Sequence, residues 1–324
     1  MTETAATQVH IWYHCHQCSA QPIAGRRWHC HTCPEGPEND LCDACYQAYR
    51  AGTVQHPPRS SPGFGLVPGP HHFEASEGQP AERFQPWLQV PLPPASAAPQ
   101  VPDRFVVRPE FCSGLSSAFG GYAFAVREAG RPLVLTALHV MDEMIQKKGI
   151  QATAANTSYT GRELPAVLTG VQLYDLFAAN WMLAELGRVG PMLVLPAART
   201  GEEEPYSDLD LAAFDATGSS APLSYGTLAA APPQVGQPAW LAVSQPGSSQ
   251  RTLEAVVVEH TERTLVFRYR DPAANPLYSS GAPWLNAAGE VVGINVGGGR
   301  LEGQRVGHAN HVTSIRRHLA TALA

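Results

Sequence analysis

The chain has 324 residues and a formal net charge of −6, with 44% hydrophobic and 15% charged residues. This balance argues against a nucleic-acid partner, which requires clustered positive charge. No window approaches the roughly 20 consecutive apolar residues of a membrane span. The first residues, MTETAATQVHIWYH, lack the basic start and apolar core of a signal peptide. We therefore expect a cytoplasmic protein without a membrane partner, with room for about two domains.

Six of the seven cysteines precede residue 46 and form three Cys-x-x-Cys pairs, which are Cys15/Cys18, Cys30/Cys33 and Cys42/Cys45. Such a turn presents two thiolates to one tetrahedral zinc ion, and a closed structural site needs four nitrogen or sulfur ligands. Six cysteines cannot fill two sites, so two histidines should complete the set. Cys112 stands apart, and we expect it to be a small buried hydrophobic residue.

The order of these motifs resembles the ZZ-type zinc finger: CxxC, then PIAGRRW, CxxC, DLCDAC and a later histidine pair. The resemblance implies two structural Zn²⁺ ions in a cross-braced module. One ion would be held by Cys15, Cys18, Cys42 and Cys45, and the other by Cys30, Cys33, His56 and one further histidine. The family's H-x-F/M ending favours His71, with Phe73 as the aromatic residue, over His72. Other candidates, expected to lie outside the ligand sets, are His10, His14, His16, His29 and His31.

ZZ fingers are generally protein-binding modules, so the resemblance implies a protein partner. The acidic candidates for such binding are Glu35, Glu38 and Asp40. His16 stands after the first cysteine, where relatives that read N-terminal residues carry an acid. Binding of protein in general is therefore expected more than capture of a charged N-terminus. One alternative is a small zinc-stabilised module without a partner. The other is a nucleic-acid-binding finger, which the negative net charge of the chain disfavours.

From about Gly63 to Asp103 the chain is rich in Pro, Gly, Ala and Ser, with PLPPASAAPQVP as a typical stretch. This composition predicts an extended, flexible linker. We therefore predict three parts: a zinc-finger module over residues 1–75, a linker over 76–103 and a larger domain over 104–324.

Short apolar runs separated by Gly and Pro fill the larger domain: YAFAV, PLVLTAL, PAVLTGV, LDLAAF, PAWLAV, LEAVVV, TLVFRY and EVVGINV. Many short strands with turn signals between them predict a mainly β barrel or sandwich. Three segments have helical patterns. They are Val140–Lys148, Leu173–Leu186 as an amphipathic insertion, and a terminal helix over Thr313–Leu323.

Three motifs in this domain carry candidate catalytic residues. LTALHV ends an apolar strand with His139, DLDLAAF places Asp210 before another, and YSSGAP places Ser280 on a glycine-rich turn. A serine is a useful nucleophile when its hydroxyl lies on a tight turn beside a base. Each residue alone has an ordinary structural explanation, whereas the three together predict a Ser-His-Asp site.

The order His, Asp, Ser and the string SSGAP…LNAAGEVVGIN resemble the chymotrypsin-like serine peptidases of trypsin fold, and the HtrA-like branch in particular. The resemblance covers about residues 104–322 and implies a double β-barrel. It makes His139 the general base, Asp210 its orienting carboxylate and Ser280 the nucleophile. Asp208 and Ser279 are the competing residues. The hairpin register and the apolar run after Asp210 disfavour them.

The same resemblance assigns an oxyanion hole to the backbone N–H groups of Tyr278 and Ser280, where the family has glycine in place of the tyrosine. A tyrosine there is strained if the turn needs positive φ. By the family alignment, the substrate-binding residues would be Ala274 and Gly307 at the primary pocket, Asn295 near the catalytic carboxylate, and Val296 and Gly297 along the substrate. No carboxylate stands at the pocket, so a small or medium apolar side chain is expected there.

We therefore expect an intracellular serine endopeptidase whose zinc finger docks protein substrates or partners, with the flexible linker raising the local substrate concentration. The alternative, motivated by Tyr278, is a catalytically weak or inactive peptidase fold that serves as an interaction scaffold. A third reading is a protease within a larger assembly that stays silent until a trigger binds the finger.

Overall fold

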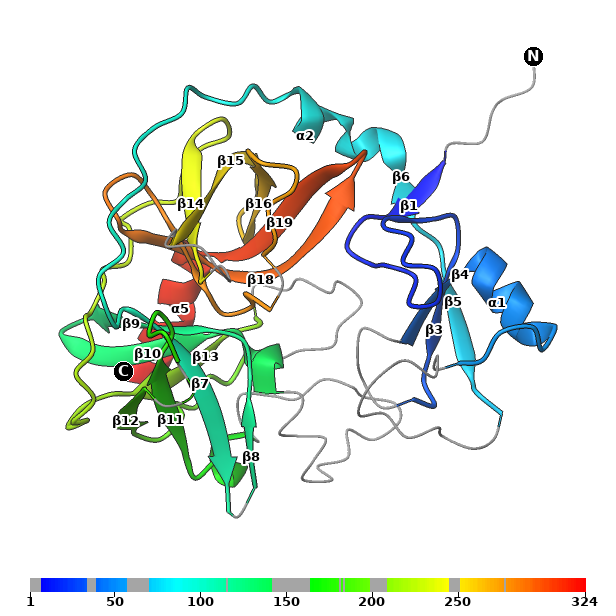
Figure 1. The fold of residues 1–324 in the computed structure, drawn as a ribbon. Coiled ribbons are helices and arrows are strands. Elements are labelled where there is room, and N and C mark those ends of the chain that lie inside the picture. The colour runs from blue at the N-terminus through cyan, green and yellow to red at the C-terminus, as the bar shows by residue number, and fades with distance from the viewer. Residues whose placement is uncertain are drawn as a thin grey trace. The chain divides into compact units, whose positions relative to one another are not determined.

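The computed structural model describes residues 7–33, 39–56, 70–114, 116–141, 164–180, 182, 184–198, 209–244, 251–276 and 278–324. The chain divides into two units (Figure 1). The N-terminal unit comprises Met1–Gln89 and Gly298–Val306. The C-terminal unit comprises Val90–Gly297 and Gly307–Ala324.

The N-terminal unit contains two small antiparallel sheets and one helix. The first sheet has the order β2 (Ile23–Ala24), β1 (Gln8–His10), β6 (Gln79–Pro80), and the second has the order β4 (Asp40–Cys42), β3 (Arg27–Cys30), β5 (Phe73–Ser76). Helix α1 (Asp43–Arg50) follows β4 directly. The Trp28 ring stacks on Tyr46 of α1, with ring centroids 3.7 Å apart. One apolar cluster around this stack buries Cys15, Ile23, Leu41 and Tyr46. A cluster of that size gives little stability by itself.

A hairpin from far along the chain completes this unit. Strands β18 (Val291–Leu301) and β19 (Gln304–His311) meet at a two-residue turn, and their ends belong to the N-terminal unit. The Arg300 N–H donates to the Ile11 carbonyl over 3.2 Å. A Cβ atom at Gly299 would lie 2.0 Å from the same carbonyl oxygen, so only glycine fits there. The N-terminal unit is thus built from two separate stretches of sequence.

The segment predicted to be a flexible linker, residues 76–103, differs from that expectation. Its first part forms β6, the short 3₁₀ helix η2 (Ala81–Phe84) and helix α2 (Gln85–Gln89). The reason is burial of two aromatic side chains, since Phe84 and Trp87 are each only 4% exposed. The structural boundary lies at Gln89/Val90, beyond the predicted end of the finger at residue 75.

The second part of that segment, Val90–Asp103, forms no helix or strand, but arginine side chains from elsewhere in the C-terminal unit hold it by hydrogen bonds. Arg268 donates to the Val90 carbonyl and Arg270 to the Pro93 carbonyl, each over 2.5 Å. Arg251 donates to Asp103 over 2.6 Å. Proline-rich chain lacks N–H donors but keeps its carbonyl acceptors, and these arginines use them. The expectation of a flexible tether is therefore wrong for these residues.

The C-terminal unit begins with a seven-stranded antiparallel sheet. Its order is β12 (Glu185–Val189), β11 (Gly170–Asp175), β7 (Val106–Ser113), β9 (Ala123–Glu128), β10 (Arg131–Thr136), β13 (Ala212–Asp215), with β8 (Ser116–Phe119) paired to β7. Strand β7 alternates buried and more exposed residues along most of its length, as a half-buried strand should. Phenylalanines at 105, 111, 124 and 214 fill the core of this sheet.

The remaining strands close a barrel in the order β14 (Pro238–Ala242), β15 (Thr252–His260), β16 (Thr264–Tyr269), β19, β18, β17 (Pro283–Leu285). The Trp284 ring stacks on Phe267 at 3.8 Å inside it. Helix α5 (Val312–Leu323) confirms the predicted terminal helix and buries Ile315 and Leu319. Its N-cap is His311, whose side chain accepts the Thr313 N–H.

The predicted helix over Leu173–Leu186 is wrong. Residues Gly170–Asp175 are strand β11, which pairs with β7 on one side and β12 on the other. Pairing along the β7 edge outweighs the local helical pattern, and the Asp175 side chain ends the strand by accepting the Phe177 N–H.

Two further expectations concern neighbouring segments. The run PAVLTGV, expected as one strand, begins as helix α4 (Leu164–Val167), with a proline in its first turn. The predicted helix over Val140–Lys148 lies outside the described residues beyond the 3₁₀ helix η3 (Leu138–Met141).

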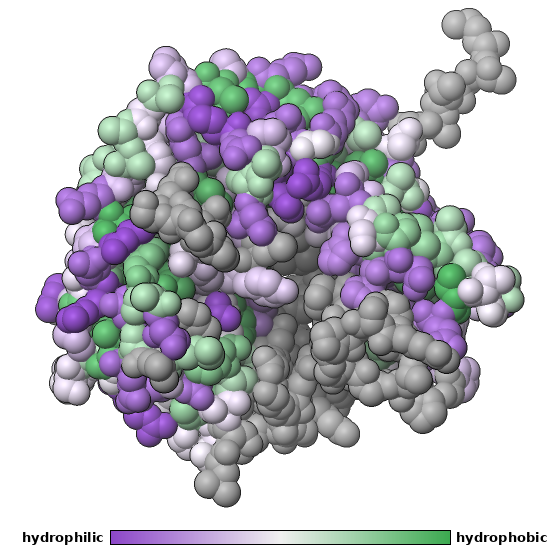
Figure 2. Space-filling model, in the orientation of Figure 1, coloured by the Kyte–Doolittle hydropathy of each residue, from purple (hydrophilic) through white to green (hydrophobic). Residues whose placement is uncertain are grey.

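On the face seen in Figure 2, purple hydrophilic and green hydrophobic residues alternate over short distances. The described part of the chain contains no helix long and apolar enough to cross a membrane. The mainly β class predicted from the sequence is confirmed by the sheet and barrel.

Candidate active site and metal clusters

His139 lies on the turn that follows strand β10. The strand is buried through its last four residues, and the chain then turns into η3, which carries His139 with its side chain 30% exposed. A histidine at the end of a buried strand is held by the strand yet reaches solvent, as a general base requires.

Asp210 lies two residues before the start of β13, the strand that pairs with β10. The pairing sets Ala212 opposite Thr136 and so brings the two neighbouring turns together. The Asp210 Oδ2 atom lies 2.5 Å from His139 Nδ1, and Oδ1 accepts the His139 backbone N–H over 3.0 Å. Because the carboxylate can only accept, Nδ1 carries the ring proton and Nε2 keeps its lone pair. The competing Asp208 lies outside the described residues.

The turn that carries Ser280 contacts the chain before strand β9 at Gly121 and Tyr122. The Tyr122 N–H donates to the Ser280 carbonyl over 2.7 Å. A Cβ atom on Gly121 would lie 2.3 Å from that carbonyl oxygen and 2.5 Å from Cγ1 of Val140, the residue after His139. Gly121 thus fits closely between the serine turn and the histidine turn. This contact was not foreseen from the sequence, where GGY reads only as a turn signal.

The two adjacent serines differ in their surroundings. Ser279 is 2% exposed, and its hydroxyl donates to the Pro276 carbonyl over 2.5 Å and accepts from Asn295 Nδ2 over 3.1 Å. Ser280 is half-buried, and its hydroxyl makes no hydrogen bond with the described residues. Catalytic hydrogen bonds often tighten only when substrate binds. The structure therefore assigns Ser279 a structural position and leaves the Ser280 hydroxyl available.

Tyr278 has a positive φ, the condition under which a tyrosine in this turn is strained. Its φ is 62°, and its side chain is 81% exposed. Bulky residues rarely adopt this conformation, at a cost of order 1–3 kcal/mol. Among the described residues, the N–H groups of Tyr278 and Ser280 donate to no acceptor. Both donors are available to an oxyanion.

The predicted substrate-binding residues lie on the closed barrel or its loops. Ala274 is 5% exposed in the loop between β16 and β17, and Val296 and Gly297 lie on β18. At Gly307 on β19, a Cβ atom would meet the Tyr269 hydroxyl at 3.1 Å and Trp284 at 3.2 Å. Two aromatic rings therefore border this position, a feature that the sequence did not indicate.

The side chain of Asn295, expected near the catalytic carboxylate, has other partners. Its Nδ2 atom donates to the Ser279 hydroxyl, and its Oδ1 atom accepts the Trp284 indole N–H over 3.2 Å. The side chain that reaches Asp210 from the barrel is Asn310, which donates to the Asp210 carbonyl over 2.6 Å. The sequence signal for Asn310 is weak, being one polar residue in the strand GHANH that leads into the terminal helix.

Two clusters of side chains that could bind a metal ion lie in the N-terminal unit. They are Cys15, Cys18, Cys42 and Cys45, and Cys30, Cys33, His56 and His71; within each, all ligand atoms lie within 4.8 Å of one another. The sulfur and nitrogen donors in sets of four fit structural zinc. Burial lowers the pKa of His56 to about 4, which keeps its imidazole neutral and able to bind a metal.

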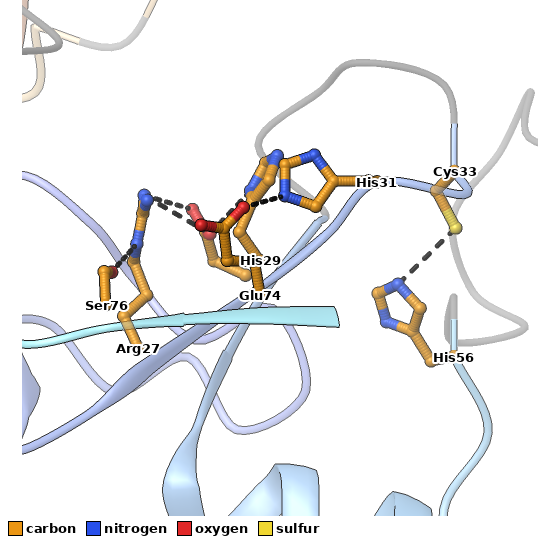
Figure 3. A network of polar contacts seen from close by, with 8 residues as sticks. Arg27, His29, His31, Cys33, His56, Glu74 and Ser76 are labelled. Carbon is orange, nitrogen blue, oxygen red and sulfur yellow. Dashed lines mark hydrogen bonds and ion pairs between the residues drawn. The ribbon is translucent and has the colours of Figure 1, made fainter. Parts of the chain in front are cut away.

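Figure 3 shows the pair of Cys33 and His56 apart from the polar contacts of Arg27, His31 and Glu74. His31 binds Glu74 over 3.0 Å, whereas Cys33 Sγ lies 3.5 Å from His56 Nε2. His71 Nδ1 lies 3.4 Å from both Cys30 Sγ and Cys33 Sγ. His72 instead donates its backbone N–H to Thr32. The described geometry therefore groups His71 with the second cluster.

Comparison with known families matches both parts of the chain. Residues 9–56 match the ZZ-type zinc finger, and residues 121–294 match the trypsin-like peptidase domain. The chain belongs to the trypsin-like peptidase family. Both resemblances, and the trypsin-like fold class with an N-terminal ZZ module, are confirmed.

One curated relative is the auxin transport protein BIG of Oryza sativa subsp. japonica, 43% identical over 47 residues. The match covers 14% of this chain and 1% of that protein.

Solved structures with a similar fold include the protease Rv3671c of M. tuberculosis in its active form, with 14% identity, a TM-score of 0.41 and coverage of 72% of this chain and 94% of that one. The HtrA-type protease AlgW with a tripeptide has 15% identity and a TM-score of 0.38, covering 67% and 60%. The serine endoprotease of Yersinia pestis has 14% identity and a TM-score of 0.39, covering 68% and 62%. At these values the likeness carries no inference about activity.

Proposed function

We propose that this protein is a serine endopeptidase in which His139, Asp210 and Ser280 form the catalytic triad. The observation that carries the proposal is the contact of 2.5 Å between His139 Nδ1 and Asp210 Oδ2. It orients the imidazole with Nε2 unprotonated, which is the tautomer that a serine nucleophile needs. The half-buried Ser280, on a turn fastened beside Val140, supports the same assignment.

The reaction follows from these positions. His139 Nε2 takes the Ser280 proton as Oγ attacks the scissile carbonyl, and Asp210 stabilises the imidazolium that forms. The carbonyl π electrons move to oxygen, which the N–H groups of Tyr278 and Ser280 would bind. Collapse breaks the C–N bond while His139 returns its proton to the leaving amine. Water then hydrolyses the acyl-enzyme by the same steps.

For substrate selection we propose the closed-barrel residues Ala274, Asn295, Val296, Gly297 and Gly307. The buried rings of Tyr269 and Trp284 lie beside Gly307 and restrict the space there. A small or medium apolar side chain before the scissile bond fits this environment best, because an unpaired charge would be costly to bury.

For the N-terminal unit we propose two structural Zn²⁺ ions, one held by each cluster. Zinc bound there would crosslink strands β3 and β4, helix α1 and the stretch before β5, and so stabilise a unit with a small apolar core. No disulfide bond joins any of the seven cysteines, which supports the reducing cytoplasm as the compartment.

The zinc unit is proposed to dock protein substrates or partners of the peptidase. Its ZZ family membership supports a protein partner. Among the acidic candidates, Asp40 is 6% exposed and engaged by Arg27 at 3.4 Å and His29 at 3.0 Å, so it is a structural residue rather than a free binding group. Glu35 and Glu38 lie outside the described residues. We accordingly propose that the unit binds proteins in general and does not select partners by a charged N-terminus.

The test is labelling with a fluorophosphonate that reacts with activated serines. The zinc-loaded wild type should form one adduct, which mass spectrometry places on Ser280, and Ser280→Ala should form none. Ser117→Ala, an exposed serine on β8, is the matched control and should label like the wild type. An adduct that persists in Ser280→Ala, or none in the wild type, would overturn the proposal.

The strain at Tyr278 favours a second candidate, a peptidase fold used as a peptide-binding scaffold. Purified protein should then bind peptides without cleaving casein, and Tyr278→Gly should create activity. Proteolysis by the wild type that is lost in Ser280→Ala would exclude this alternative.

A further inference from the structure

Asp210 is held by two different parts of the C-terminal unit. Its carboxylate contacts only His139, through the ring Nδ1 and the backbone N–H, among the hydrogen bonds of the described residues. Its backbone carbonyl accepts from Nδ2 of Asn310, over 2.6 Å. His139 and Asp210 lie beside the ends of β10 and β13 of the first sheet, whereas Asn310 lies on β19 of the closed barrel, which also carries the Ser280 turn. Asn310 therefore bonds the acid–base pair to the barrel of the nucleophile.

The surroundings of Asn310 fix its amide in one orientation. The side chain is fully buried, and the Asp210 carbonyl can only accept, so Nδ2 must face it. A Cβ atom on the adjacent Gly293 would lie 2.5 Å from the Asn310 carbonyl oxygen, which leaves the backbone little room to shift. The Asn310 Oδ1 atom has no hydrogen-bond partner within the described part of the chain. A buried amide that is only half satisfied is unfavourable for stability, so stability alone does not explain it.

His308 precedes Asn310 by two residues on the same strand and therefore points to the same face. Burial lowers its pKa to about 3, although the negative charge of Asp210 acts in the opposite direction. The imidazole is thus neutral near neutral pH and does not compete with His139 as the positive partner of Asp210. Only the amide of Asn310 bonds Asp210 from β19, and it bonds the backbone, leaving both carboxylate oxygens to His139.

We propose that Asn310 is a positioning residue, whose amide fixes Asp210 and through it His139 in register with Ser280. The inference rests on the proposed peptidase function. A misplacement of about 1 Å far from the reacting atoms can reduce a rate by about 10²-fold. Asn310→Leu, which keeps the volume and removes the donor, should lower kcat by about 10- to 100-fold and leave KM within about twofold.

Gln172→Leu provides the matched control, because it removes another buried amide on β11, and among the described residues the Gln172 side chain bonds only the neighbouring Leu173 carbonyl. Its kcat should match the wild type. A second readout does not depend on turnover: the low-field NMR signal of the His139 Nδ1 proton should shift or broaden in Asn310→Leu and stay unchanged in Gln172→Leu. A folded Asn310→Leu with wild-type kcat and an unchanged proton signal would overturn the inference.

Measurements on the unaltered protein cover the case in which Asn310→Leu does not fold. The Asn310 side-chain amide signals should move when a fluorophosphonate adduct forms on Ser280, whereas those of Gln172 should not. Unmoved Asn310 signals in a fully labelled protein would contradict the positioning role. If the protein instead cleaves peptides equally well as Ser280→Ala, the proposed function fails, while the proton signals still report whether Asn310 orients the His139–Asp210 pair.

Discussion

His139 Nδ1 lies 2.5 Å from Asp210 Oδ2, although 71 positions separate the two residues in sequence. The pairing of β10 with β13 produces this contact, because His139 follows one strand and Asp210 precedes the other. The backbone N–H of His139 adds a second bond to the same carboxylate. The ring is thus fixed in tautomer and in direction before any substrate arrives.

Asp210→Asn tests the importance of that relationship. The amide keeps the volume but lets His139 take the other tautomer, with Nε2 protonated and unable to accept from serine. We expect kcat to fall by about 10⁴-fold while the fold is retained. Peptide hydrolysis and near-ultraviolet circular dichroism measure the two properties. A loss of less than tenfold would show that this carboxylate does not orient the base.

Two substitutions at Tyr278 test its backbone conformation and the N–H that we propose for the oxyanion hole. Tyr278→Gly removes the strain at φ 62° and keeps the donor, so stability should rise by about 1 kcal/mol and kcat should be equal or higher. Tyr278→Pro fixes φ near −65° and removes the donor, and should lower kcat by about 10²–10³-fold. Equal activity of the two variants would exclude this N–H from the reaction. Chemical denaturation gives the stability change.

Removal of zinc should unfold the N-terminal unit. Structural zinc contributes roughly 10–16 kcal/mol of apparent free energy in small fingers. We expect two zinc ions per chain by elemental analysis, and loss of β-sheet signal with a strong chelator. His71→Ala should retain one ion, whereas the control His72→Ala should retain two, since His71 belongs to the cluster of Cys30, Cys33 and His56 and His72 does not. The reverse result would make His72 the ligand.

His308 predicts a dependence of stability on pH. Its folded pKa of about 3 lies below the ordinary value of 6.5, so the unfolded chain binds the proton first as pH falls. The free energy of unfolding should therefore decrease below about pH 6.5, by on the order of 1 kcal/mol per pH unit for this group. His308→Leu should show a shallower slope in urea denaturation between pH 7 and pH 5. Gln172→Leu, which loses no titrating group, should keep the wild-type slope.

The hydrogen bonds that hold Val90–Asp103 predict that this segment resists proteolysis. Arg268→Ala leaves the Val90 carbonyl without its donor, at a cost of about 1–3 kcal/mol if the carbonyl stays buried. We expect faster cleavage between residues 90 and 103 by a nonspecific protease. Arg263→Ala, an exposed arginine just before β16, should be cleaved like the wild type. Rapid cleavage of the wild type itself at these positions would show that these hydrogen bonds do not protect the segment.

Local motifs allowed several features to be predicted from sequence. Ligand types and Cys-x-x-Cys spacing predicted the two metal clusters, because a tetrahedral ion needs four donors at short range. Short apolar runs with turn residues between them predicted the mainly β class. Strand-end motifs predicted His139, Asp210 and Ser280, although their catalytic roles stay predictions. In each case a few neighbouring residues carry the chemical information.

Other features depend on contacts between distant residues, and only the tertiary structure decided them. Leu173 lies in a strand because β7 offers an edge to pair with, and Asn310 reaches Asp210 because β19 of the closed barrel brings its side chain to the turn before β13. The proline-rich stretch is held by Arg268, 178 residues away. Sequence alone determined which residues could bind metal or act on a peptide. Long-range packing decided which of them meet, since hydrogen-bond partners remote in sequence leave no local pattern.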